Sequence, residues 1–140
     1  MRHRLHQHGD LVVDDNDDGA QTLATLLQVL GYDAAVAQDG REAIELAERF
    51  SPHLVLLDLG LPLMDGHAVC RHMRAQPWSE GMAIVALTGW GQEQDRQRTR
   101  AAGFDDHLVK PAELEALTAL FDRLWGDESA AAVRAGVAPP

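Results

Sequence analysis

Five short apolar segments, each followed by a stretch of helical periodicity, constrain the fold of this chain more than any other feature of its sequence. The segments are residues 11–13, 34–37, 54–57, 82–87 and 107–109. The third, Leu-Val-Leu-Leu at 54–57, is apolar on both faces, which predicts a central strand of a parallel sheet covered on both sides. Between the segments, apolar residues recur at helical spacing, as at Leu23, Leu27 and Leu30. The alternation predicts a doubly wound α/β fold.

The length of 140 residues fits a single folded domain. We expect an N-terminal tail at 1–9, the domain at 10–126 and a flexible tail or linker at 127–140, where Ala, Gly and Pro are frequent. Right-handed crossovers leave few orders for five parallel strands, and the order 2-1-3-4-5 places the first and third strands side by side. In such sheets ligands bind beyond the carboxyl ends of the strands.

The charge of the chain narrows its possible partners. Twelve Lys and Arg residues against 22 Asp and Glu residues give a formal net charge of -10, which repels nucleic acid and anionic lipid at long range. No apolar run approaches the ~20 residues of a membrane span, and the single cysteine, Cys70, excludes an intramolecular disulfide. We therefore expect a cytoplasmic protein that binds no nucleic acid directly and does not insert into membranes.

Polar side chains follow four of the five predicted strands. Asp14 and Asp15 follow the first, Asp58 the third, Thr88 the fourth, and Lys110, the only lysine of the chain, the fifth. Three carboxylates at one edge disfavour each other's ionisation unless a cation binds, and Mg²⁺ prefers such oxygen ligands. A carboxylate can also attack phosphorus, and Asp58 lies in the middle of the sheet. These residues predict a Mg²⁺-assisted phosphoryl site.

Within that site Lys110 would neutralise the phosphoryl oxygens, and the Thr88 hydroxyl would donate to one of them once the group is present. Each residue also has an ordinary interpretation. Asp58 alone could open a turn, Asp14 and Asp15 could favour a helix dipole, and a lone lysine is usually solvated. The combination at one edge favours the functional interpretation.

Four short motifs occur in order along the chain. They are Val-Asp-Asp-Asn at 13–16, Leu-Asp-Leu-Gly-Leu-Pro-Leu-Met-Asp-Gly at 57–66, Ala-Leu-Thr-Gly at 86–89 and Val-Lys-Pro at 109–111. Together they resemble the receiver domains of two-component response regulators, and the resemblance covers residues 10–126. It implies a (βα)5 flavodoxin-like fold in which Asp14, Asp15, Asp58 and the Gly60 backbone carbonyl hold Mg²⁺. It also implies that Asp58 accepts a phosphoryl group from a histidine kinase or a histidine phosphotransfer protein.

The resemblance further implies a cis peptide bond before Pro111 and a switch in which Thr88 moves together with the aromatic residue three positions before the lysine. That position holds His107, whose ring is polar and titratable. Two residues that flank the hydrolytic water in the family are Gly60 and Trp90 here, which predicts an altered phosphoryl lifetime.

The resulting prediction is a regulatory phosphoacceptor rather than an enzyme, and a downstream protein recognises its phosphorylated state. A homodimer is one assembly open to it, and it is either a stand-alone domain or part of a hybrid histidine kinase. One alternative is a scaffold that acts without phosphorylation. Another is an aspartyl-phosphate phosphohydrolase, although such enzymes place a second acid where this chain has Gly60. A nucleotide-binding flavodoxin-like protein is a third, but the acidic run at 14–18 would repel a phosphate.

Overall fold

The computed structural model describes residues 9–89 and 96–134, with residues 127–134 as backbone only. The strands are β1 (Asp10–Val13), β2 (Ala34–Ala37), β3 (Leu54–Asp58), β4 (Ala83–Thr88) and β5 (Asp106–Val109). The helices are α2 (Asp17–Val29), α3 (Gly40–Phe50), α4 (Gly66–Arg74), the 3-10 turn η1 (Pro77–Ser79), α5 (Arg96–Ala102) and α6 (Leu114–Arg134). All five predicted strands are present.

The strands form one parallel sheet in the order β2-β1-β3-β4-β5, which confirms the predicted doubly wound α/β fold and strand order. Val13 pairs with Leu57, Asp58 with Leu87, and Thr88 with Val109. Because these pairs lie at the carboxyl ends of the strands, the residues that follow them meet at one edge of the sheet.

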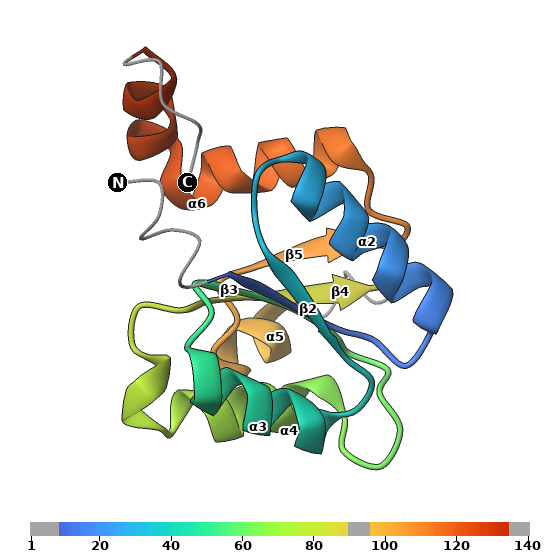
Figure 1. Cartoon of the computed structure of the whole chain (residues 1–140). Coiled ribbons are helices and arrows are strands. Elements are labelled where there is room, and N and C mark those ends of the chain that lie inside the picture. The colour runs from blue at the N-terminus through green and yellow to red at the C-terminus, as the bar shows by residue number, and fades with distance from the viewer. Residues whose placement is uncertain (1–8, 90–95, 135–140) are drawn as a thin grey trace.

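Helices cover both faces of the sheet, with α2 and α6 on one side and α3, α4 and α5 on the other (Figure 1). Strand β3 supplies both apolar layers. Its Leu54 and Leu56 pack under α2 and α6, whereas Val55 and Leu57 pack under the other helices, and all four are completely buried. A strand apolar on both faces therefore became the centre of the sheet, as the sequence predicted.

Side-chain caps fix the starts of the two helices that flank the acidic edge. The Asn16 carboxamide accepts a hydrogen bond from the Gly19 N–H at 3.1 Å and starts α2. The Asp65 carboxylate accepts one from the Ala68 N–H at 2.9 Å and starts α4. Each cap satisfies a donor in the first helical turn and holds the preceding loop in place.

The last helix extends into the segment at 127–140 that we expect to be a flexible tail or linker. Helix α6 continues to Arg134 across a non-helical residue, Trp125 (φ -137°, ψ 33°), and Figure 1 shows its two parts pointing in different directions. Residues 127–134 are rich in Ala with Glu and Arg, which favour a helix over a linker. Residues 1–8 of the predicted tail, and 135–140, lie outside the described residues.

Helix α5 is described from Arg96 onward, because residues 90–95 also lie outside the described part of the chain. Among the described helices, none is both long enough and apolar enough to cross a bilayer.

Candidate functional site

Three carboxylates predicted to lie together do so. Oxygen atoms of Asp14, Asp15 and Asp58 all lie within 4.8 Å of one another at the carboxyl ends of β1 and β3. Asp14 and Asp58 are buried, and Asp15 is exposed. The acidic group at this edge of the sheet is therefore open to solvent on the side of Asp15.

The carboxylate of Asp58 is held from two directions. The Gly60 N–H donates to Oδ1 at 3.0 Å, and Nζ of Lys110 lies 3.3 Å from Oδ2. The following loop closes back on Asp58, because the Gly66 N–H donates to the Leu59 carbonyl at 3.2 Å. A Cβ at Gly66 would lie 2.6 Å from the Asp58 carbonyl oxygen, so only glycine fits this approach.

Asp14 shares the same lysine. The Asn16 N–H donates to Oδ1 of Asp14 at 3.0 Å, and Nζ of Lys110 lies 3.6 Å from Oδ2. Burial is the main cause that raises the pKa of Asp14, and the charge of Asp58 adds to it, while the Asn16 hydrogen bond and Lys110 act in the opposite direction. The Lys110 ammonium therefore offsets the effect of burial on Asp14 only in part.

The donor set fits a divalent cation. The available ligand atoms are carboxylate oxygens, which Mg²⁺ prefers. A bound cation would offset the burial, and the weaker repulsion from Asp58, that raise the pKa of Asp14. Lys110 lies beside the cluster rather than within it, with its side chain about one third exposed (36%), so room for a ligand remains on the solvent side.

Thr88 is at the predicted edge, but its hydroxyl is engaged elsewhere. The side chain is buried, and Oγ1 donates to the Leu108 carbonyl of β5 at 3.3 Å. Lys110 and Pro111 follow β5 and are joined by a cis peptide bond, as the resemblance implied. The structure therefore gathers the acids and the lysine, and leaves the threonine bonded to the neighbouring strand.

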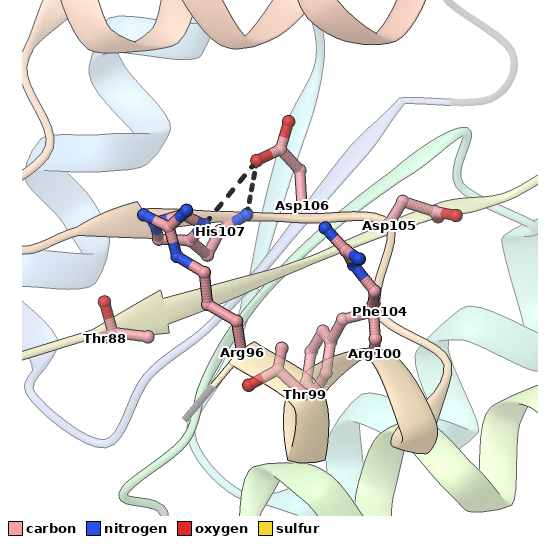
Figure 2. A pocket seen from close by; sticks show the side chains of 8 residues that line it. All are labelled: Thr88, Arg96, Thr99, Arg100, Phe104, Asp105, Asp106 and His107. Atoms are coloured by element: carbon pink, nitrogen blue, oxygen red, sulfur yellow. Dashed lines mark hydrogen bonds and ion pairs between the residues drawn. The ribbon is translucent and has the colours of Figure 1, made fainter. Parts of the chain in front are cut away.

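His107 lines a small cavity of about 120 Å³ behind Thr88. Figure 2 shows the cavity-lining side chains, which are Thr88, Arg96, Thr99, Arg100, Phe104, Asp105, Asp106 and His107. The Arg96 guanidinium lies 3.3 Å from Nε2 of His107, and Nδ1 lies 3.7 Å from Oδ1 of Asp106. A guanidinium can only donate, so a hydrogen bond between these groups requires Nε2 of His107 to be the acceptor.

Two ion pairs that brace β5 were missed by the sequence analysis. Nη2 of Arg74 lies 2.6 Å from Oδ2 of Asp105, and Nε of Arg123 lies 2.8 Å from Oδ2 of Asp106. Burial acts to raise the pKa of Asp106, but the hydrogen bonds from Arg123 and the His107 N–H hold it below its ordinary value. The available signal was the pair of consecutive acids before the last strand.

Trp90, expected to affect phosphoryl lifetime, lies outside the described residues.

Comparisons with known proteins agree with this geometry. A family model described as "Response regulator receiver domain" matches residues 11–122. The chain is 35% identical over 109 residues to the DNA-binding dual master transcriptional regulator RpaA of Synechocystis, covering 78% of this chain but only 45% of that protein. It therefore spans less than half of that regulator. It is also 38% identical over 109 residues to an uncharacterised 14.6 kDa protein of Leptolyngbya boryana, covering 78% of this chain and 83% of that one.

Solved structures give the same answer. The receiver domain of the sensor histidine kinase PA1611 from Pseudomonas aeruginosa, with a magnesium ion in its active site cleft, is 31% identical with a TM-score of 0.74, over 84% of this chain and 98% of that one. The receiver domain of Ssk1 from Saccharomyces cerevisiae, solved with the histidine phosphotransfer protein Ypd1, is 28% identical with a TM-score of 0.70, over 78% and 82%.

Proposed function

The chain belongs to the receiver domains of two-component response regulators, and we propose that Asp58 is its phosphoacceptor. The observation that carries the assignment is the position of Asp58, mid-sheet, with Lys110 at 3.3 Å and two further aspartates within 4.8 Å. Receiver domains are regulatory, so the chemistry serves a signal.

The phosphoryl transfer follows from the two contacts of Asp58. An Asp58 oxygen attacks the phosphorus of a phosphohistidine, the new O–P bond forms as the P–N bond breaks, and the imidazole leaves with the electron pair and takes up a proton. The Gly60 N–H holds Oδ1, and Lys110 is placed to neutralise the anionic phosphoryl oxygens.

Members of this family bind Mg²⁺ at an acidic pocket, and we assign the ligands here to Asp14, Asp15, Asp58 and the backbone carbonyl of Gly60. When bound, Mg²⁺ supplies positive charge that offsets the carboxylates and orients the phosphoryl group. Asp14 and Asp15 keep their places because the Asn16 N–H holds one of them and the cap of α2 fixes the loop.

The donor is a histidine kinase or a histidine phosphotransfer protein, like the partner with which the Ssk1 receiver domain was solved. A cavity of about 450 Å³ opens beside Lys110 and leads to Asp14. Its walls include Leu23 and Pro111, so an apolar surface adjoins the acidic edge. A protein donor could therefore seat apolar side chains there while its phosphohistidine reaches Asp58.

Phosphorylation is read through Thr88 and His107. The Thr88 hydroxyl would leave the Leu108 carbonyl for a phosphoryl oxygen, which alters the wall of the cavity that His107 lines. His107 contacts Arg96 of α5 and lies beside Asp106, which Arg123 of α6 binds. A change at Thr88 thus reaches the α5, β5 and α6 surface that a downstream protein, or a second copy of the chain, would contact.

The same residues argue against two other activities. Turnover of a small phosphorylated substrate would need an acid two residues after Asp58, and Gly60 offers none. Direct nucleic acid binding is disfavoured by the net charge of -10. RpaA is named as DNA-binding, but this chain spans 45% of it. A mobility shift of duplex DNA by this chain at low salt would contradict the second statement.

One experiment separates the phosphoacceptor from a scaffold that acts without phosphorylation. The protein is incubated with acetyl phosphate and Mg²⁺, and intact mass is measured. We expect the added mass of one phosphoryl group, absent in Asp58→Asn and present in the surface control Asp122→Asn. No added mass in the wild type, or added mass that persists in Asp58→Asn, would refute the assignment.

A further inference from the structure

A second group of titratable side chains lies at the amino ends of the strands, on the opposite edge of the sheet from Asp58. Asp10 begins β1 and is completely buried. His53 directly precedes β3, and its Nε2 lies 3.2 Å from Oδ1 of Asp10. Within the described part of the chain, neither Asp10 oxygen accepts a hydrogen bond. The contact with the imidazole is therefore the compensation that the structure offers this carboxyl group.

His53 is also one member of a closed cycle of four packed rings. Tyr32 packs on His53 with centroids 5.3 Å apart, and His53 packs on Trp125 at 5.3 Å. Phe121 completes the cycle, at 5.1 Å from Tyr32 and 5.7 Å from Trp125. The two rings from α6, Phe121 and Trp125, thus pack on Tyr32 and His53 at the amino edge of the sheet.

Trp125 is also the residue at which α6 bends. Its backbone is non-helical, and the second part of the helix runs on to Arg134 in a different direction (Figure 1). On one side Trp125 contacts His53, and on another it lines an open surface cavity of about 520 Å³ with Met82 and Leu124. This open cavity leaves space beside the indole.

The electrostatics of the cluster disfavour net negative charge. Burial raises the pKa of Asp10 well above its ordinary value of 3.8, and the charge of Asp33 raises it further. Burial and the charge of Asp10 also raise the pKa of Tyr32, and its buried hydroxyl has no hydrogen-bond partner among the described residues. Among the side chains that the structure describes, Asp10, Tyr32, Asp33 and His53 are the titratable groups of this cluster. The described side chains of α6 that pack on it, Phe121 and Trp125, are uncharged rings.

We propose that the Asp10–His53 pair is a proton-controlled latch for the C-terminal part of α6. While the pair holds one proton it is neutral overall, and Trp125 stays packed on His53. When that proton passes to solvent, a net negative charge is left buried beneath aromatic rings, and such a charge is stable only if water reaches it. The ring cycle opens, and Trp125 moves away together with the helical segment that follows it. The latch does not depend on phosphorylation of Asp58.

The direction of the pH dependence follows from the raised pKa of Asp10. A raised pKa means that the folded protein favours the protonated carboxyl, so this contribution to stability is complete below pH 3.8 and is lost as the pH rises through the higher folded pKa. The latch is therefore closed at lower pH and released at higher pH.

The test uses Trp125 as its own reporter. In a Trp78→Phe/Trp90→Phe background, acrylamide quenching of the remaining tryptophan is followed against pH, and the His53 ring resonances are followed by NMR in the same samples. We expect quenching to increase in a single reversible transition as pH rises, with the same midpoint as His53. Circular dichroism checks that the fold persists throughout.

Variants separate the latch from general loosening at high pH. In Asp10→Asn the transition should disappear, because the amide cannot leave a buried negative charge. In His53→Gln it should move down by about one pH unit, because the carboxyl loses the imidazole that shares its proton. The matched control is His72→Gln, on the exposed side of α4, which should behave as the parent.

Three results would overturn the latch. They are quenching that does not change with pH, a transition that survives in Asp10→Asn, and midpoints for Trp125 and His53 that differ. If Asp10→Asn does not fold, the comparison of midpoints in the parent and the shift in His53→Gln still decide. Unchanged phosphorylation of Asp58 in His53→Gln would show that the opposite edge is intact.

Discussion

The two edges of the sheet both bury carboxyl groups, but they deal with the charge in different ways. At the carboxyl edge Asp14 and Asp58 share Lys110, and the exposed Asp15 keeps the group in contact with solvent. At the amino edge Asp10 is completely buried and faces an imidazole beneath aromatic rings. We propose that the first edge takes up a cation and a phosphoryl group. The second tolerates its carboxyl group best while a proton keeps it neutral.

The strongest way to break this contrast is to remove Lys110. Lys110→Gln should slow phosphorylation of Asp58 by roughly 10²–10³-fold, the usual effect of losing one preorganised group that stabilises developing charge. The rate is measured by intact mass after mixing with acetyl phosphate and Mg²⁺. The exposed Arg41→Gln serves as the control. An equal loss in both variants would mean that the overall charge, rather than the Lys110 position, sets the rate.

Removal of Mg²⁺ should change the free energy of unfolding differently for variants at the two edges. With Mg²⁺ at 100 times its dissociation constant, binding to the folded state alone adds about 2.7 kcal/mol to the free energy of unfolding. We expect Asp14→Asn to lose most of this increment and Asp10→Asn to keep it, measured by thermal unfolding with Mg²⁺ and with EDTA. An increment of the same size in Asp14→Asn would exclude that residue as a ligand.

The loop that closes on Asp58 offers a test of packing at the carboxyl edge. In Gly66→Ala the new Cβ would lie 2.6 Å from the Asp58 carbonyl oxygen, so we expect a loss of roughly 1–3 kcal/mol in unfolding free energy. Gly126→Ala meets no atom within 4 Å and should change stability little. Denaturant titration of both variants decides, and equal stabilities would show that the loop relaxes freely.

The smallest expected effect is the change in stability when one hydroxyl group is removed at each edge of the sheet. Tyr32→Phe removes a buried hydroxyl without a partner among the described residues, and should stabilise the fold by about 1 kcal/mol. Thr88→Val removes a hydroxyl bonded to the Leu108 carbonyl, and should destabilise it by about the same amount. Chemical denaturation measures both. Changes of the same sign would contradict the difference between the two edges.

Much of the carboxyl edge was predictable because its information is local. Asp14, Asp58, Thr88 and Lys110 each end or follow an apolar strand, and parallel strands bring such positions to one edge. The state of Thr88 was not predictable, because its bond to Leu108 depends on how β4 and β5 are paired. Helix α6 also continues past residue 126, where the predicted domain ends, because the chain bends at Trp125 and then resumes a helical course.

By itself the sequence determined the α/β alternation, the strand order and the set of residues at the carboxyl edge, since strand direction and hydrophobic pattern suffice for these. Only the tertiary structure decided the amino edge. Asp10 and His53 occupy positions with no recognisable motif, and their contact arises because β1 and β3 are neighbours whose first residues pair in register. Trp125 joins them because α6 crosses the same face as α2. Side-chain contacts between distant segments depend on register and packing, which no local pattern records.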